Sequence, residues 1–135
     1  VMRLVGSEMC IRDRVNSVSN IYHDLIIVYG CGGERDSSER GKIMKFTCAN
    51  SRKVIFTSDN CRNESFQSIL DDSRKDQEYS NLIVEPDRKQ AIKNGIDALK
   101  EDEILLILGK GHEEFQEIKG TKIPFNDQRV VEEIL

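Results

Sequence analysis

The feature that most constrains the fold of this chain is a set of short, continuously apolar runs. Leu25–Tyr29 and Ile104–Leu108 contain no charged residue, and each is followed directly by glycine. Uninterrupted apolar runs of strand length are typical of strands buried on both faces, as in parallel sheets. Lys53–Thr57 and Asn81–Glu85 have the same length and an apolar centre. The sequence therefore predicts that these runs are strands of one mostly parallel sheet.

Helical patterns fall between these strands. One helix is expected across about residues 41–50. A second helix would follow Asn63, which can serve as its N-cap, and would carry Phe66, Ile69 and Leu70 on one face. Such alternation of strands and helices favours right-handed crossovers.

A third helix is expected after Asp87. Asp87 and Gln90 have the spacing of a capping box, with Asp87 as the cap. Ile92, Ile96 and Leu99 then form one apolar stripe at helical spacing. This helix would lead from the strand at 81–85 to the strand at 104–108.

The C-terminal part departs from this alternation. Phe115–Ile118 and Thr121–Ile123 flank Lys119-Gly120, a pattern that predicts a short hairpin. A final helix would be capped by Asn126 or Asp127. Its inner face is expected to carry Val130, Val131, Ile134 and Leu135.

The predicted fold class is α/β: a doubly wound, mostly parallel sheet flanked by helices (Rossmann-like), with a C-terminal hairpin and helix. A chain of 135 residues suits one domain, which we place at residues 15–135. Residues 1–14 are expected to be non-native or disordered, because they show no regular period and Ser7–Asp13 resembles a translated sequencing adapter. The alternative is an ordinary flexible segment.

Composition argues against several classes of protein. The formal net charge is −4 and the basic residues are scattered, so no nucleic-acid-binding face is expected. No apolar run approaches the ~20 residues of a membrane span, and no signal-peptide pattern is recognisable. The four cysteines form no Cys-x-x-Cys pair, which disfavours a zinc knuckle or a thioredoxin motif. Reduced thiols in a cytoplasmic protein are expected.

Polar, glycine-containing segments follow the predicted strands. They are Gly30–Asp36, Thr57–Arg62 and Gly109–Glu113. Because the carboxyl ends of parallel strands meet at one edge of a sheet, where ligands bind, we expect these segments to form a single shared site.

The side chains in these segments suit a zwitterionic ligand. Arg35 and Arg62 could each form a bidentate pair with a carboxylate, while Asp59 and the carbonyl of Asn60 could accept from an ammonium group. Glu113 could also bind an ammonium group. The alternatives at this point are a plain glycine-rich turn, capping roles for the Asp and Asn, and solvated arginines.

Two further residues lie beside Glu113. Lys110 is a candidate supporting residue, and His112 could either orient a carboxylate or be structural. A metal site built from His112, Glu113 and Glu114 is disfavoured because adjacent residues converge poorly on one ion, and no metal ligand is assigned.

The glycine patterns do not match nucleotide-binding motifs. Gly30–Arg35 lacks the third glycine of Gly-x-Gly-x-x-Gly. Gly109–His112 has neither the spacing nor the final Ser or Thr of a phosphate-binding P-loop. The sequence therefore contains no recognisable motif for binding a dinucleotide or a nucleoside triphosphate.

Taken together, the motifs resemble one family. Gly-Cys-Gly-Gly-Glu-Arg-Asp, Thr-Ser-Asp-Asn-Cys-Arg, Asp87-Arg88 before a helix, Gly-Lys-Gly-His-Glu-Glu-Phe-Gln, Pro124-Phe125 and Asp127 occur in the order seen in Mur ligases. The chain resembles the C-terminal domain of this family over about residues 21–135, and in particular the members that add diaminopimelate.

The resemblance implies an ATP-dependent ligase of peptidoglycan biosynthesis. Such an enzyme joins meso-diaminopimelate to UDP-N-acetylmuramoyl-L-alanyl-D-glutamate. ATP and Mg²⁺ would be bound mainly by ligase domains missing from this chain, and none by the chain itself. The implied partners are the amino acid, the UDP-linked muramoyl dipeptide and those missing domains, with no nucleic acid and no membrane. The chain alone is expected to be inactive and to lack the start of the family's domain.

The resemblance also assigns site residues, all for substrate binding and none catalytic. Arg35 matches an arginine that contacts a diaminopimelate carboxylate. Asp59, Asn60 and Arg62 match the Asp-Asn-Pro-Arg motif that selects diaminopimelate over lysine. Gly109 and Glu113 match the pair that holds the distal zwitterionic end, which Lys110 and His112 would support. Lysine lacks the second carboxylate and would leave Arg62 unpaired, a penalty that can reach ~10⁴-fold.

The chain departs from the family pattern in three places. Glu34 replaces the usual aspartate, which is a mild change. Cys61 replaces the motif's proline, which is expected to soften the loop. The segment 37–42 does not align with the family's basic run, so no role is assigned to Arg40 or Lys42. The alternatives are a ligase of the same fold that adds L-lysine, and a non-catalytic small-metabolite-binding α/β module.

Overall fold

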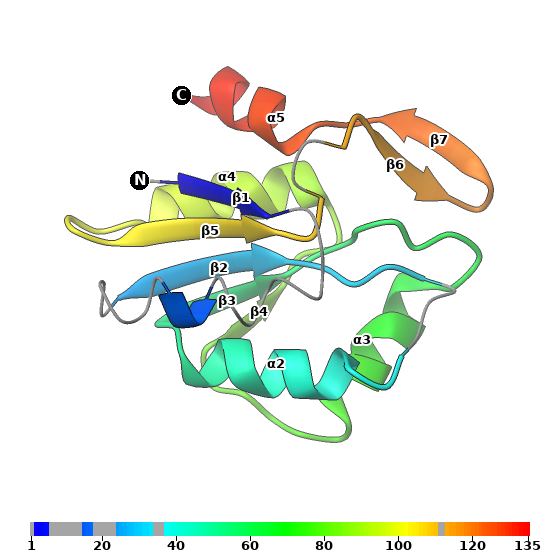
Figure 1. Cartoon of the computed structure of the whole chain (residues 1–135), viewed down its shortest axis with the longest axis horizontal. Helices are drawn as coiled ribbons and strands as arrows, with labels where there is room; N and C mark the ends of the chain where they lie inside the picture. The colour runs from blue at the N-terminus through cyan, green and yellow to red at the C-terminus, as the bar shows by residue number, and fades with distance from the viewer. Residues whose placement is uncertain (1, 6–14, 18–23, 34–36, 111–112) are drawn as a thin grey trace.

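The computed structural model describes residues 2–5, 15–17, 24–33, 37–110 and 113–135. Its centre is a sheet of five strands in which every neighbouring pair is parallel, in the order β1-β5-β2-β3-β4 (Figure 1). The strands are β1 (Met2–Val5), β2 (Leu25–Tyr29), β3 (Lys53–Phe56), β4 (Leu82–Val84) and β5 (Ile104–Leu108). The predicted parallel sheet is confirmed.

The order of the strands reverses between β2 and β5. The chain runs outward from β2 through β3 to β4, and then crosses back to β5 on the other side of β2. Gly30 follows β2 and Gly109 follows β5, so these glycines flank the reversal. Ligands of open α/β sheets bind outside the carboxyl ends of the strands at such a point.

Helices cover both faces of the sheet, as Figure 1 shows. They are α2 (Arg40–Ala49) and α3 (Phe66–Arg74) on one face, and α4 (Arg88–Ala98) and α5 (Asp127–Ile134) on the other. Successive strand residues alternate between the two cores: Ile27 packs with the core that includes Met44 and Ile69, whereas Val28 packs with the core that includes Ile92. This double-sided burial confirms the doubly wound α/β class.

The helix starts differ from the predictions in detail. Ser65, and not Asn63, caps α3, because Ser65 is the extended residue next to the helix and its hydroxyl accepts the N–H of Ser68 at 3.0 Å. Asp87 caps α4 as predicted. The Gln90 side chain donates to Asn94 instead of turning back to Asp87, so the reciprocal half of the capping box is wrong.

The final helix is also partly corrected. Asn126 caps α5 by accepting the N–H of Arg129 at 3.0 Å. Val130 and Val131 are buried as expected, whereas Leu135 is 77% exposed and does not belong to the inner face. Leu135 follows the last residue of α5, so the helical period no longer fixes its direction.

The sequence analysis assigned no strand to residues 1–14, yet β1 lies within them. Met2–Val5 pairs with Leu105–Leu108 as an edge strand. Its identification from sequence failed because the run is short and interrupted by Arg3. The boundary of the domain at residue 15 stays a prediction.

The predicted hairpin is confirmed. β6 (Phe115–Ile118) and β7 (Thr121–Pro124) pair antiparallel, with Lys119 and Gly120 at the turn. The hairpin extends beyond the carboxyl ends of the strands, between β5 and α5 (Figure 1). Among the described residues, no helix has both the length and the apolar character needed to cross a bilayer.

An ion pair lies at the amino-terminal end of the sheet, opposite the carboxyl ends of the strands. Arg52 donates to both carboxylate oxygens of Glu103, at 2.6 and 2.7 Å, and to the carbonyl oxygen of Ala98 at 2.8 Å. The hydrogen bond from Arg52 lowers the pKa of Glu103 below its ordinary value, although burial opposes this shift. The pair joins the residues before β3 and β5.

Glu103→Gln is expected to lower the free energy of unfolding at pH 7 by about 1.5–3 kcal/mol, because a buried charge-assisted hydrogen bond is weakened. The pKa of Glu103 is depressed in the folded state, so its contribution is present above the unfolded pKa and is lost as the pH falls through the folded value. Urea unfolding between pH 7 and pH 3 should therefore show a shallower acid decline in this variant. The exposed Glu101→Gln serves as the control, and an equal decline in both variants would contradict the assignment.

Candidate functional site

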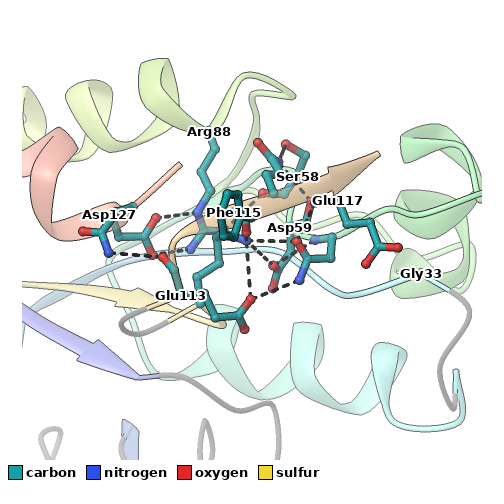
Figure 2. A network of polar contacts seen from close by, with 12 residues as sticks. Gly33, Ser58, Asp59, Arg88, Glu113, Phe115, Glu117 and Asp127 are labelled. Carbon is teal, nitrogen blue, oxygen red and sulfur yellow. Dashed lines mark hydrogen bonds and ion pairs between the residues drawn. The ribbon is translucent and has the colours of Figure 1, made fainter. Parts of the chain in front are cut away.

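A buried ion pair anchors the carboxyl edge of the sheet. Arg88 donates to both oxygens of Asp127 at 2.7 Å, and both side chains are fully buried (Figure 2). The same guanidinium donates to the carbonyl oxygens of Ser58 and Leu108 at 3.2 Å each. It thus connects the start of α4, the start of α5 and the ends of β3 and β5.

The environment of Arg88 keeps it charged. Burial alone would lower the pKa of the guanidinium, but the hydrogen bonds from Arg88 to Asp127 and the negative charge of Asp127 outweigh burial and raise the pKa. A buried pair of this kind is strongly destabilising to break, because the remaining charge has no partner. The pair therefore fixes where the loops after β3 and β5 begin.

Gly109 lets the loop after β5 approach Asp59. Its φ is +110°, a conformation that L side chains rarely adopt, and a Cβ here would lie 2.7 Å from Oδ2 of Asp59. Asp59 is itself buried, and its Oδ1 accepts the backbone N–H of Asn60 at 2.8 Å. The absence of a side chain at Gly109 is therefore what allows the two loops to meet.

Lys110 joins the same two loops from inside. Its ammonium is fully buried and donates to the carbonyl oxygen of Phe115 at 2.7 Å and to Oδ1 of Asn60 at 3.0 Å. It also lies 3.5 Å from Oδ1 of Asp59 and 3.7 Å from Oε2 of Glu113. With these oxygens around its three N–H donors, the buried charge is compensated.

Asn60 connects Lys110 to Glu113. Its Nδ2 donates to Oε2 of Glu113 at 3.1 Å, and its Oδ1 accepts the backbone N–H of Glu117 at 2.9 Å. The Glu113 side chain is 44% exposed. Within the described part of the chain its second oxygen, Oε1, accepts no hydrogen bond, so it can receive one from a ligand.

Arg62 occupies a strained backbone conformation. Its φ is +54°, in the left-handed region that costs a non-glycine residue of the order of 1–2 kcal/mol. The hairpin holds it there: the N–H of Arg62 donates to the carbonyl oxygen of Glu117 at 2.9 Å, and Lys119 donates to the carbonyl oxygen of Arg62 at 2.6 Å. Strain that the surroundings maintain is common at functional sites.

The Arg62 guanidinium is only partly engaged. Its Nη1 donates to the carbonyl oxygens of Gly33 at 2.8 Å and Asn60 at 3.3 Å, and its Nε lies 3.7 Å from Glu117. Nη2 makes no hydrogen bond with the described residues. Two N–H groups are thus available to a carboxylate.

A surface hollow of about 260 Å³ lies beside Asn60 and Glu113. Its lining residues are Asn60, Glu113, Glu114, Phe115, Glu117 and Lys122. The lining has an excess of carboxylates over amines, which favours a cationic group such as an ammonium.

The structure brings together most of the residues named from sequence. Asp59, Asn60, Gly109, Lys110 and Glu113 form one contact network, and Arg62 joins it through the carbonyl oxygen of Asn60. The predictions for Arg35 and His112 lie outside the described residues. Their ligand-binding roles stay predictions.

Several residues of the site escaped the sequence analysis as functional groups. Arg88, Asp127 and the buried Gln116 were recognised only as parts of quoted motifs. Gln116 donates to Oγ of Ser58 at 2.7 Å and to the carbonyl oxygen of Asp59 at 2.9 Å. Its place at the end of the quoted segment 109–116 was the available signal.

Cys61 is a core residue and not a reactive thiol. Its side chain is buried, and burial raises the pKa of the thiol above its ordinary value. Its N–H donates to the carbonyl oxygen of Asp59 at 3.1 Å, a bond that a proline could not make. The cysteine thus supplies a local constraint in place of a fixed φ.

The chain is similar to proteins of one known family. The family model described as "Mur ligase, glutamate ligase domain" matches residues 11–111. The chain belongs to the Mur ligase family. The resemblance drawn from the strand-end motifs is therefore confirmed.

Two similar Mur ligases have the same name. The UDP-N-acetylmuramoyl-L-alanyl-D-glutamate–2,6-diaminopimelate ligase of Aquifex aeolicus is 47% identical over 116 residues, covering 82% of this chain and 23% of the relative. The ligase of the same name from Helicobacter pylori is 44% identical over 107 residues, covering 78% of this chain and 24% of the relative. The chain thus spans about a quarter of the length of these curated relatives.

Solved structures agree with the fold. A UDP-N-acetylmuramoyl-L-alanyl-D-glutamate–2,6-diaminopimelate ligase superposes with a TM-score of 0.88 at 29% identity, covering 99% of this chain and 28% of that chain. A folylpolyglutamate synthase from Thermotoga maritima shares the fold, with a TM-score of 0.52 at 19% identity, covering 76% of this chain and 23% of that chain.

Gly109→Ala is expected to lower the free energy of unfolding by about 2 kcal/mol or more, because it combines an unfavourable φ with contact against Asp59. Gly120→Ala is the matched control: φ is +76° there, but nothing lies within 4 Å of the added Cβ. Its loss should be roughly 1 kcal/mol. Urea unfolding of both variants measures the difference, and equal losses would show that the approach to Asp59 is not tight.

Proposed function

We propose that this chain is the amino-acid-binding domain of an ATP-dependent ligase that adds meso-diaminopimelate to UDP-N-acetylmuramoyl-L-alanyl-D-glutamate. The reaction would belong to peptidoglycan biosynthesis in the cytoplasm. Membership of the Mur ligase family and the shared name of the relatives support the proposal. Because the chain covers about a quarter of those relatives, the activity would belong to a longer protein.

The observation that carries the proposal is the meeting of two loops from different strands. Asn60 lies two residues before Arg62, and its side chain donates a hydrogen bond to Glu113 at 3.1 Å. This bond spans the point where the strand order reverses. Arg62 has N–H donors, and Glu113 has a carboxylate oxygen, that make no hydrogen bond with the described residues. These groups complement an amino acid's carboxylate and ammonium groups. Arg35 would add a second guanidinium.

The selectivity of Arg62 needs one correction. The sequence analysis expected that lysine would leave this guanidinium unpaired, but Nη1 already has the carbonyl oxygens of Gly33 and Asn60. Only Nη2 would lack a partner. The rejection of lysine should therefore be about 10- to 150-fold, the value of one charge-assisted hydrogen bond at about 1.5–3 kcal/mol.

We assign no site for ATP or Mg²⁺ to this chain. The sequence contains no P-loop motif. In the ranges that the structure describes, no His, Cys, Asp and Glu residues gather into a metal-binding group. The proposed role of this chain is to hold and orient the amino acid, while ATP, Mg²⁺ and the UDP-linked dipeptide would be bound mainly by the rest of the ligase. The chain alone should show no ligase activity.

A ligase of the same fold that adds L-lysine is the second candidate. Glu113 and the acidic hollow would serve the amino group of either substrate. The Nη2 of Arg62, which has no partner among the described residues, favours diaminopimelate, because diaminopimelate has a carboxylate where lysine has none. A non-catalytic metabolite-binding module is disfavoured by the family membership.

In a full-length ligase carrying this domain, Arg62→Ala should raise the KM for meso-diaminopimelate by about tenfold or more, because a charge-assisted hydrogen bond is lost. The KM for ATP should change by less than about twofold, since ATP lies elsewhere. Arg74→Ala on α3 is the control arginine. Steady-state kinetics with each substrate varied in turn provide the measurement, and an unchanged diaminopimelate KM in Arg62→Ala would sink the proposal.

A further inference from the structure

Arg40, the first residue of α2, has a buried guanidinium to which the proposed function gives no role. Only 4% of its side chain is exposed. It donates to the two carboxylate oxygens of Glu64, both at 3.2 Å, to Asp72 at 3.3 Å and to the carbonyl oxygen of Gly32 at 2.9 Å. The start of α2 lies beside α3 in Figure 1, so this guanidinium sits where several segments meet.

Asp72 lies on α3, whereas the other two partners of Arg40, Gly32 and Glu64, belong to the two loops that lead to the candidate site. Gly32 lies in the loop after β2, just before the segment that contains Arg35. Glu64 follows Arg62 by two residues, and its N–H donates to the carbonyl oxygen of Cys61 at 3.1 Å. One buried cation is therefore bonded to both loops.

The two loops are also in direct backbone contact. The N–H of Gly33 donates to the carbonyl oxygen of Asn60 at 2.7 Å. A Cβ added at Gly33 would lie 1.9 Å from the carbonyl oxygen of Cys61, which leaves room for glycine only. Arg62 completes the contact by donating to the carbonyl oxygen of Gly33 at 2.8 Å. A small shift of either loop would thus change where the Arg62 guanidinium points.

We propose that Arg40 is a positioning residue for the amino-acid site. It acts through Gly32 and Glu64 to hold the loop after β2 against the loop that carries Arg62. This inference rests on the proposed function. It predicts that Arg40 affects the amino-acid substrate and its discrimination from lysine, without touching the substrate itself.

The guanidinium geometry explains why arginine suits this position. Its planar fork bonds both oxygens of Glu64 and still reaches a backbone carbonyl in another direction. Burial alone would lower the pKa of Arg40, but the bonds to Glu64 and the negative charges nearby raise it. A lysine would keep the charge and lose the fork, so Arg40→Lys should be intermediate in effect.

The chain contains a matched control for a merely structural role. Arg52 also bonds both oxygens of a glutamate, Glu103, and a backbone carbonyl, that of Ala98. It lies at the opposite end of the sheet, before β3, and so has no path to the Arg62 loop through these contacts. Loss of either arginine should destabilise the fold, whereas only loss of Arg40 should alter the amino-acid site.

The test uses a full-length ligase carrying this domain, with Arg40→Met, Arg40→Lys, Arg52→Met and Arg62→Ala. Unfolding, the KM for meso-diaminopimelate, the KM for ATP and the ratio of kcat/KM for diaminopimelate over lysine are measured for each. We expect Arg40→Met to raise the diaminopimelate KM roughly tenfold and to lower the ratio, the scale of coupling between contacting residues. Arg40→Lys should fall between it and the wild type.

The outcomes distinguish the positioning role of Arg40 from a merely structural role, and from failure of the proposed function. Arg52→Met should leave the diaminopimelate KM and the ratio unchanged. If Arg40→Met and Arg40→Lys change them no more than Arg52→Met does, while Arg62→Ala has its expected effect, the positioning role is wrong and the proposed function stands. If Arg62→Ala itself leaves the diaminopimelate KM unchanged, the proposed function fails and this inference fails with it. Where Arg40→Met does not fold, Arg40→Lys and Glu64→Gln decide by the same comparison.

Discussion

The buried pair of Arg88 and Asp127 is the interaction on which the rest of the carboxyl edge depends. It connects the start of α4 to the start of α5. The same guanidinium also donates to the carbonyl oxygen of Leu108, the last residue of β5, and to that of Ser58. The hairpin β6–β7 lies between β5 and α5, so both of its ends are held by this pair. The hairpin in turn holds the strained backbone of Arg62. A contact far from the exposed surface therefore helps to fix the Arg62 guanidinium, which we assign to the ligand.

Buried cations recur throughout this edge. Arg40, Arg88 and Lys110 are each almost wholly removed from water, and each is surrounded by carboxylate, amide or carbonyl oxygens. Burying a charge is costly unless it is paired and hydrogen-bonded, so these groups add little net stability. Their main effect is to fix the relative positions of separate segments, because each cation bonds oxygens from more than one segment. The partly buried Arg62 and the exposed Glu113 then remain for a ligand, and these contacts hold their loops in place.

The sequence could predict the sheet because the strand signal is local. Leu25–Tyr29 and Ile104–Leu108 are apolar throughout, and a strand buried on both faces has no other simple pattern. The shared site also followed from local information, since the carboxyl ends of parallel strands meet at one edge. The polar segments after the strands at 53–57 and 104–108 then predicted that Asp59, Asn60 and Gly109 lie close together.

The parts that sequence could not predict depend on long-range contacts. Asp127 lies 39 residues from Arg88, and nothing in either neighbourhood shows that the two meet in the core. Arg40 was left without a role because its segment did not align with the family, and its partners come from Gly32, Glu64 and Asp72. The choice between Asn63 and Ser65 as the cap of α3 depended on backbone angles that both residue types tolerate.

The most direct test of the central claim is an amide-resolved NMR titration of the 135-residue chain with meso-diaminopimelate, and with L-lysine as the control. If the amino-acid site lies within this chain, diaminopimelate should shift the signals of Asn60, Arg62 and Gly109, and lysine should shift them less at the same concentration. Equal shifts with both amino acids would contradict the selectivity assigned to Arg62. No shift at these residues, in a chain whose spectrum shows it to be folded, would contradict the claim that this domain holds the site.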